Sequence, residues 1–169
     1  MSIFETLTRE HGVMLGLTAR VERAFRGGRD DGEGRRCLLV LHHALALHEE
    51  IEDLVVGPAG KDASPELARA LCRIALQHAE IVSLRDETRA LLGRADCRDE
   101  STPRLTVLSL LLARRLRAHF QSEELRLWPL LAGSGGRSVG RSLARRAEKG
   151  VADLQKHVRE LERATVEYL

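Results

Sequence analysis

The sequence has few aromatic residues, which make up only 3% of its 169 positions. A hydrophobic core must therefore be built mainly from Leu, Ala and Val, a composition that favours helices over strands. Hydrophobic residues account for 43% and charged residues for 31% of the chain, which is typical of a globular protein. The length suits one domain with a substantial core.

The chain also lacks an excess of charge of one sign. It has 27 basic and 25 acidic residues, a net charge of +2. This balance gives no reason to expect nucleic acid or an anionic membrane surface as a partner. No apolar run approaches the ~20 residues that a membrane-spanning helix requires. We therefore expect neither nucleic-acid binding nor insertion into a membrane.

Cysteine is scarce, and its arrangement excludes a disulfide framework. The three cysteines, Cys37, Cys72 and Cys97, are odd in number and show no C-x-x-C spacing. The first residues, MSIFETLTREH, contain no apolar signal core. Both features predict a protein of the reducing cytoplasm.

Glycine-rich and proline-containing stretches divide the chain into five segments with helical spacing of apolar residues. The expected helices cover residues 3–26, 35–56, 65–92, 103–131 and 140–168. The pattern predicts an all-α protein, an antiparallel up-down-up-down four-helix bundle with an additional C-terminal helix. We expect the bundle to occupy residues 1–132, followed by a linker and an amphipathic helix in residues 133–169.

Each of the first four helices carries one histidine on its apolar face. At about 100° per residue, His11, His48, His78 and His119 fall among the leucines and isoleucines of their helices. Glutamates follow two of them by one turn, Glu52 after His48 and Glu123 after His119. A single inward-facing histidine is usually a hydrogen-bonded core residue, but the joint placement of all six side chains points to a shared site.

Burial of two carboxylates strengthens this interpretation. An ionised carboxylate in an apolar bundle costs several kcal/mol unless a positive charge compensates it. A metal ion supplies that charge, and imidazole together with carboxylate suits iron. His11 and His48 lie at nearly equal distances along the chain from the loop between them, as do His78 and His119. Glu52 is closer than His78 to the second loop, which must therefore overhang or contain an extra turn.

The stretches TREHGVM (8–14), HEEIED (48–53), LQHAEI (76–81) and HFQSEELRLWPLL (119–131) together resemble the hemerythrin-like (HHE cation-binding) domains. The last stretch is the most specific, because Trp128-Pro129 falls where the family often has an aromatic residue followed by proline. The resemblance covers about residues 3–131 and implies two non-haem iron ions. The implied ligands, with Glu52 and Glu123 bridging, are His11, His48, Glu52, His78, His119 and Glu123.

One departure from the oxygen-carrying members concerns the third helix. Those proteins have an H-x-x-x-H pair there, whereas Ile74 and Val82 flank His78 at that spacing. Glu49 or water would then fill the position of the missing histidine. This favours an open site that reacts with oxygen or hydrogen peroxide, with catalase-like peroxide removal as one form. The alternatives are a module that binds or senses oxygen, iron or nitric oxide without turnover, and a metal-free bundle with structural histidines.

The remaining histidines are not expected to bind metal. His42 and His43 point about 240° and 140° away from the direction of His48, so we expect them at the surface or flank. His157 lies in the C-terminal helix, outside the resemblance. That helix is amphipathic, and we expect it to cap the bundle or to form a homodimer interface. Arg115 and Arg126 are expected to pair with acids such as Glu124 or Glu22, or to extend to the bundle edge.

Overall fold

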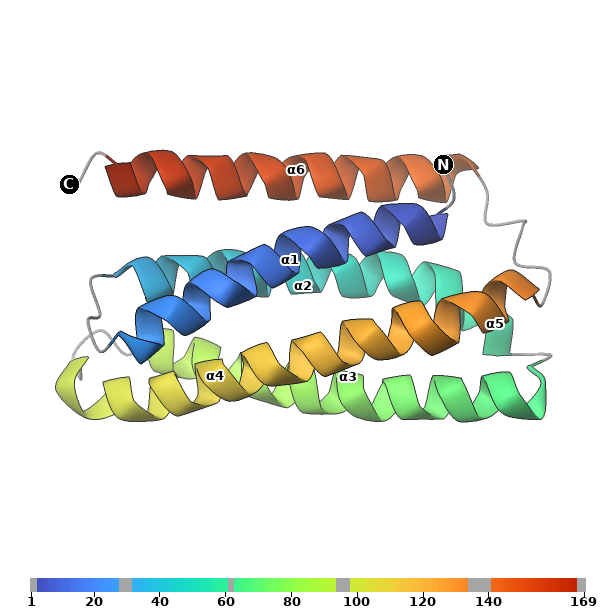
Figure 1. Cartoon of the computed structure of the whole chain (residues 1–169), viewed down its shortest axis with the longest axis horizontal. Helices are drawn as coiled ribbons and strands as arrows, with labels where there is room; N and C mark the ends of the chain where they lie inside the picture. The colour runs from blue at the N-terminus through green and yellow to red at the C-terminus, as the bar shows by residue number, and fades with distance from the viewer. Residues whose placement is uncertain (1–2, 28–31, 61–62, 94–97, 134–140, 167–169) are drawn as a thin grey trace.

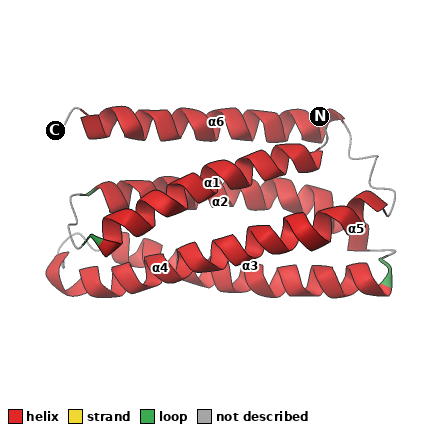
Figure 2. Cartoon of the chain, viewed as in Figure 1, coloured by secondary structure: helices red, strands yellow, loops and turns green. Residues whose placement is uncertain are grey.

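A computed structural model describes residues 3–27, 32–60, 63–93, 98–133 and 141–166 of the chain. All regular secondary structure within these ranges is helical, as Figure 2 shows. The all-α fold class expected from the sequence is therefore confirmed. Cys97 and the linker residues 134–140 lie outside the described residues.

The chain forms long helices joined by short connections. α4, the π-helical turn η2 and α5 follow one another without a break, so that the fourth rod of the fold comprises all three. The elements are α1 (Ile3–Arg26), α2 (Glu33–Val56), the 3-10 turn η1 (Gly57–Gly60), α3 (Pro65–Leu92), α4 (Arg98–Ser122), η2 (Glu123–Leu127), α5 (Trp128–Gly133) and α6 (Arg141–Val166).

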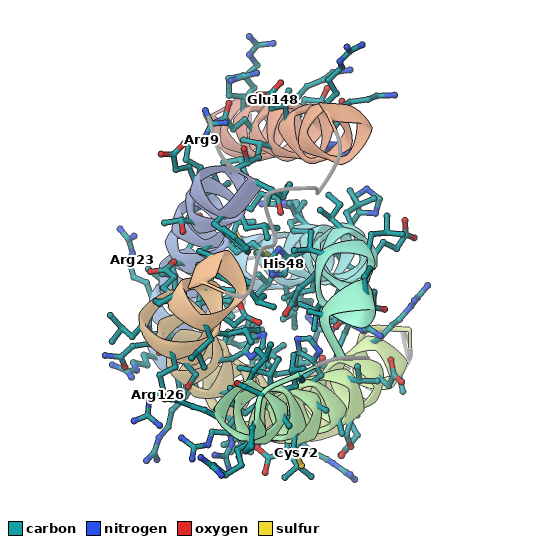
Figure 3. All side chains as sticks on the ribbon, turned by 90° about the vertical axis from the view of Figure 1, so that its right-hand side faces the viewer. Arg9, Arg23, His48, Cys72, Arg126 and Glu148 are labelled. Carbon is teal, nitrogen blue, oxygen red and sulfur yellow. The ribbon has the colours of Figure 1, made fainter. Side chains whose placement is uncertain are left out.

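The helices lie lengthwise against one another as a bundle (Figure 1). α1 packs against both α2 and α4, and α3 packs against both α4 and α2. α6 contacts α1 and α2 and therefore lies on the side of that pair remote from α3 (Figures 1 and 3). Four helices thus surround a common interior, while α6 adds a layer over two of them.

Several local features of the sequence set the ends of these helices. Ser64 caps α3, because its hydroxyl accepts a hydrogen bond from the backbone N–H of Leu67 at 3.2 Å, and Pro65 occupies the first helical position. The extra turn expected in the second loop is present as η1. The predicted start of the fourth helix was wrong, since Pro103 lies inside α4. The helix begins at Arg98 and contains Pro103, although proline has no backbone N–H to donate to the preceding turn.

The buried apolar side chains form two separate clusters. One lies toward the end where α1 joins α2 and includes Met14, Leu41 and Leu112. The other lies toward the opposite end and includes Leu7, Ile74 and Leu127. Along the four rods, the boundary between the two clusters falls at His11, His48, His78 and Glu123, and Glu52 and His119 lie one helical turn from it. A polar layer therefore divides the core.

The described side chains that dock the C-terminal helix include two valines and a histidine. Val151 is buried, and Val158 packs against the larger apolar cluster. The rings of His157 and His43 lie 5.4 Å apart across the contact between α6 and α2. Several other apolar positions of this helix lie outside the side chains that the structure describes: Leu143, Ala147, Leu154, Leu161 and Thr165.

A search of the described helices for a membrane-spanning segment finds none that combines sufficient length with sufficient apolar character. Cys37 is buried and Cys72 is exposed, and neither forms a disulfide.

Candidate metal centre

The polar layer contains two groups of side chains that could each hold a metal ion. Glu52, His78, His119 and Glu123 form one group, and His11, His48 and Glu123 form the other. Within each group, one donor atom from every member lies within 4.8 Å of the others. Glu123 belongs to both groups. The structure thus brings together all six predicted ligand residues and joins the two groups through one carboxylate.

Helix geometry and helix pairing both contribute to this convergence. Residues four apart lie on the same side of an α-helix, and His119 Nε2 is accordingly 2.9 Å from Glu123 Oε1. Across helices, His11 Nε2 and His48 Nε2 are 3.3 Å apart. His78 Nε2 and His119 Nε2 are 3.0 Å apart. The equal depths expected from the loop positions are therefore confirmed for both pairs. Figure 3 shows His48 in the interior while Arg23 and Arg126 point outward.

The spacing of the donor atoms suits a shared cation. Two atoms that each bond a metal at about 2.1 Å stand roughly 3.0–3.4 Å apart when the bond angles lie between octahedral and tetrahedral values. The two histidine pairs fall within this range. So does the 3.2 Å separation between His11 Nε2 and Glu123 Oε2, and the same separation between His78 Nε2 and Glu52 Oε2.

The outward-facing nitrogens of three imidazoles have acceptors. His11 Nδ1 lies 2.8 Å from a carboxylate oxygen of Glu124, and His48 Nδ1 lies 3.0 Å from one of Glu10. His119 Nδ1 lies 3.3 Å from the amide oxygen of Gln77. An ionised carboxylate only accepts hydrogen bonds, so Nδ1 must carry the proton in the first two cases. In the neutral tautomer, Nε2 then presents a lone pair to the interior.

This arrangement requires a positive charge between the imidazoles. Two lone pairs that face one another at 3.3 Å repel, and only a cation or additional protons can occupy the space between them favourably. Hydrogen-bonded Nδ1 atoms with inward Nε2 lone pairs are the usual state of histidine ligands to metals. The residues present therefore fit a metal ion.

The carboxylates lead to the same conclusion. Glu52 and Glu123 are almost fully buried, and the groups that face their oxygens are imidazoles, those of His11 and His119 at Glu123 and that of His78 at Glu52. Burial raises the pKa of Glu52 to about 7. The hydrogen bond to His78 opposes this rise, and the negative charge of Glu123 adds to it. Burial also raises the pKa of Glu123, but the imidazoles of His11, His119 and His78 outweigh it and hold that pKa well below its ordinary value.

Two of the four histidines, His78 and His48, favour the protonated form when only the protein charges are present. Burial lowers the pKa of His78, but Glu123 and Glu52 outweigh burial and raise the pKa to about 10. Burial also lowers the pKa of His48, but the hydrogen bond to Glu10 and the charges of the nearby carboxylates outweigh burial and raise that pKa. The pKa of His119 is lowered, chiefly by burial. A metal ion entering this centre would displace the protons held by His78 and His48.

Aromatic side chains hold the first histidine in place. The ring of Phe120 stacks on His11 with centroids 4.1 Å apart and planes 12° from parallel. The ring of Trp128 also stacks, with its centroid 6.0 Å from that of His11 and 5.5 Å from that of Phe4. Trp128 of the sequence pattern therefore lies beside a candidate ligand.

Glu49, the possible extra ligand, does not belong to either group. Its Oε2 accepts a hydrogen bond from Arg85 Nη1 at 2.7 Å, so it is directed toward α3. Ile74 is buried in the apolar cluster beside the centre. The structure supplies no side chain of the first four helices in place of the missing histidine within the described residues.

His42 corrects an expectation from the sequence. It is not at the surface but buried, and its Nε2 lies 2.9 Å from the hydroxyl of Thr88. Burial, with the nearby positive charges of Arg85 and Arg89, lowers the pKa of His42 to about 4, so the ring is neutral. His43 is exposed and His157 is half-buried, both outside the two groups.

The arginines also differ from the expected pairing. Arg115 pairs with Glu80 at 3.2 Å, while Glu22 pairs with Arg117 at 2.6 Å. Glu124, the other expected partner, bonds to His11 instead. Arg126 is exposed on η2, which agrees with the other expectation, that it extends to the bundle edge.

Sequence reasoning missed Glu10 and Gln77, and it did not assign Glu124 to His11. Glu10 is adjacent in sequence to His11, and Glu124 to Glu123. On an α-helical wheel, adjacent residues point about 100° apart, so the wheel placed Glu10 and Glu124 away from the site. Glu123 and Glu124 nevertheless contact the two nitrogens of the same imidazole. Both belong to η2, a π-helical turn of the kind often found at functional sites. No signal in the residue pattern predicted that turn.

Comparison of the chain with protein-family models, with curated protein sequences and with solved structures finds no match. The assignment of the centre therefore rests on the residues and geometry described above.

Proposed function

We propose that this chain is a hemerythrin-like protein, an antiparallel up-down-up-down four-helix bundle that holds a non-haem di-iron centre. Its ligands are His11, His48, Glu52, His78, His119 and Glu123. The observation that carries the proposal is the pair of buried donor groups that share Glu123. Glu123 Oε1 lies beside His119 and Oε2 beside His11, which supports a bridging role.

Glu52 supports a second bridge between the groups. Its Oε2 lies 3.2 Å from His78 and 3.8 Å from His48, so that one carboxylate faces a histidine from each group. Helical bundles that place glutamates and histidines in this way commonly hold two iron or manganese ions. Imidazole and carboxylate donors are compatible with iron, and neither donor group found among the described residues contains the thiolate that softer metals prefer.

The chain around the centre favours reaction with a small oxidant, oxygen or hydrogen peroxide. A di-iron centre would supply two metal ions able to exchange electrons with such a molecule. His11, His48 and Glu123 would hold one of them with three protein donors, fewer than the four of the other group. Five of the six ligand side chains are nearly inaccessible, while the side chain of His78 is 23% exposed. Of the six, His78 is therefore the ligand side chain that solvent reaches most readily.

Iron analysis tests the metal assignment. We expect about two iron ions per chain and near-ultraviolet charge-transfer absorption in the oxidised protein. His119→Ala should lose iron, whereas His43→Ala, at an exposed position outside both groups, should keep it. A protein from iron-replete cells that contains no iron and takes up no Fe(II) would reject the proposal.

Peroxide turnover separates the enzymatic function from the binding alternative. We expect the iron-loaded protein to release oxygen from hydrogen peroxide faster than an equal concentration of free iron, and His119→Ala to abolish this activity. Reversible oxygen binding over several cycles without peroxide turnover would instead favour a carrier or sensor. A homodimer through α6 is a separate prediction that sedimentation of the purified chain tests.

A further inference from the structure

A buried glutamate connects the metal centre to the C-terminal helix. Glu10 of α1 is only 3% exposed, and its Oε2 accepts a hydrogen bond from His48 Nδ1 at 3.0 Å. Its other oxygen, Oε1, faces Gly150 of α6. A β-carbon at Gly150 would lie 3.1 Å from this oxygen and 3.2 Å from Ile51 Cδ1. The carboxylate is therefore enclosed between a candidate ligand and the backbone of α6.

The identity of residue 150 fits this close approach. Gly150 lies within α6, where glycine is destabilising relative to alanine because of its greater backbone freedom in the unfolded chain. Gly12 and Gly16 of α1 are also inside a helix, but a β-carbon at either would have no neighbour within 4 Å. Gly150 differs from them because the carboxylate of Glu10 lies in the space that a side chain at position 150 would enter.

We infer that Glu10 is a positioning residue for His48, and that α6 fixes the position of Glu10 through Gly150. The inference rests on the proposed metal-binding function. The carboxylate holds the proton of His48 on Nδ1 and so directs Nε2 toward the centre. α6 packs over Glu10 and keeps it from water, which would otherwise compete for its oxygens. Docking of α6 and the affinity of the centre for metal are consequently coupled.

Four variants test this coupling: Glu10→Ala, Glu10→Gln, Gly150→Ala and the double variant Glu10→Ala/Gly150→Ala. The affinity for Fe(II) is measured under anaerobic conditions, with Co(II) absorption as a second probe. Loss of an outer partner of a histidine ligand typically lowers metal affinity about 10- to 100-fold, and we expect this for Glu10→Ala. Glu10→Gln retains an oxygen that accepts the Nδ1 hydrogen bond and should recover most of that loss.

Gly150→Ala should lower metal affinity, by less than Glu10→Ala does, because the new methyl group makes the Glu10 carboxylate or the Ile51 side chain shift by a few tenths of an ångström. In the double variant, Gly150→Ala should cause no further loss, since its effect acts through the carboxylate that is already absent. Gly16→Ala is the matched control and should leave the affinity unchanged. Circular dichroism of every variant establishes that the helices are formed.

A second measurement does not depend on metal. In the metal-free protein, nuclear magnetic resonance should detect an exchange-protected Nδ1 proton on His48. Glu10→Ala should remove this signal, Gly150→Ala should shift it, and Gly16→Ala should not. Unchanged signals in both test variants would overturn the inference, as would additive losses of metal affinity in the double variant. The His48 signal could respond as expected while neither the parent nor any variant binds Fe(II) or Co(II). That result would reject the proposed metal-binding function and not the positioning role of Glu10.

Discussion

Replacement of Glu52 by glutamine should stabilise the metal-free protein and weaken the metal-loaded one. The substitution keeps the size of the side chain but removes its charge. In the metal-free protein that charge is 1% exposed, lies 3.2 Å from His78 Nε2, and is close to the ionised Glu123. With metal bound, the same charge is a ligand, and its loss should reduce affinity.

The pKa of Glu52 sets the size of the effect. It is raised from 4.5 in the unfolded chain to about 7 in the folded one, chiefly by burial. Between these values the folded state binds more protons than the unfolded state, so the contribution of Glu52 to stability falls as pH rises. At one pK unit per 1.36 kcal/mol, the penalty reaches on the order of 3 kcal/mol at pH 8 and falls to roughly 1 kcal/mol at pH 5.

The assay is urea unfolding of the parent and Glu52→Gln proteins, with chelator and then with Fe(II) in the absence of oxygen. With chelator, the variant should be more stable at pH 8 and nearly equal to the parent at pH 5. With metal, the order at pH 8 should reverse, because binding stabilises the parent more strongly. Asp53→Asn, an exposed charge change on the same helix, should reproduce neither effect. A variant less stable than the parent at pH 8 with chelator would refute the reasoning.

Two further outcomes follow from the same geometry. Glu123→Ala should lose metal more severely than His11→Ala, because Glu123 belongs to both donor groups and His11 to one; equal metal contents would argue against a bridging carboxylate. The buried His42, whose pKa is lowered from 6.5 to about 4, should give stability that is complete above pH 6.5 and lost as pH falls toward 4, by on the order of 3 kcal/mol. Unfolding titrations with chelator should show this dependence, and His42→Gln should remove it.

The sequence alone predicted the helices and the six converging side chains, because both depend on local periodicity. Helical spacing placed His119 and Glu123 on one side, and loop positions placed His11 level with His48. The contacts of Glu10 and Gln77 could not be predicted in this way. Glu10 is buried because α6 packs over it, and nothing in the spacing of residues 141–166 specifies that register.

The error at His42 has a similar cause. The helical wheel assumed one buried side for each helix, centred on the ligand histidine. α2, however, contacts α1, α3 and α6, so it is buried on more than one side. A residue turned about 240° from His48 therefore meets Thr88 of α3 rather than solvent. The number of neighbours around a helix is a property of the whole fold, which periodicity within one helix does not reveal.

The division of the core also bears on why these residues occupy its centre. Two apolar clusters lie on either side of the polar layer, and each draws on all four rods of the bundle. Leucines in the layer would have joined the clusters and avoided the cost of burying Glu52 and Glu123. The bundle therefore depends on its apolar ends for stability and holds the layer between them in a strained electrostatic state. A cation would relieve that state, so we expect the side chains that most weaken the metal-free protein to contribute most to the binding of the proposed ion.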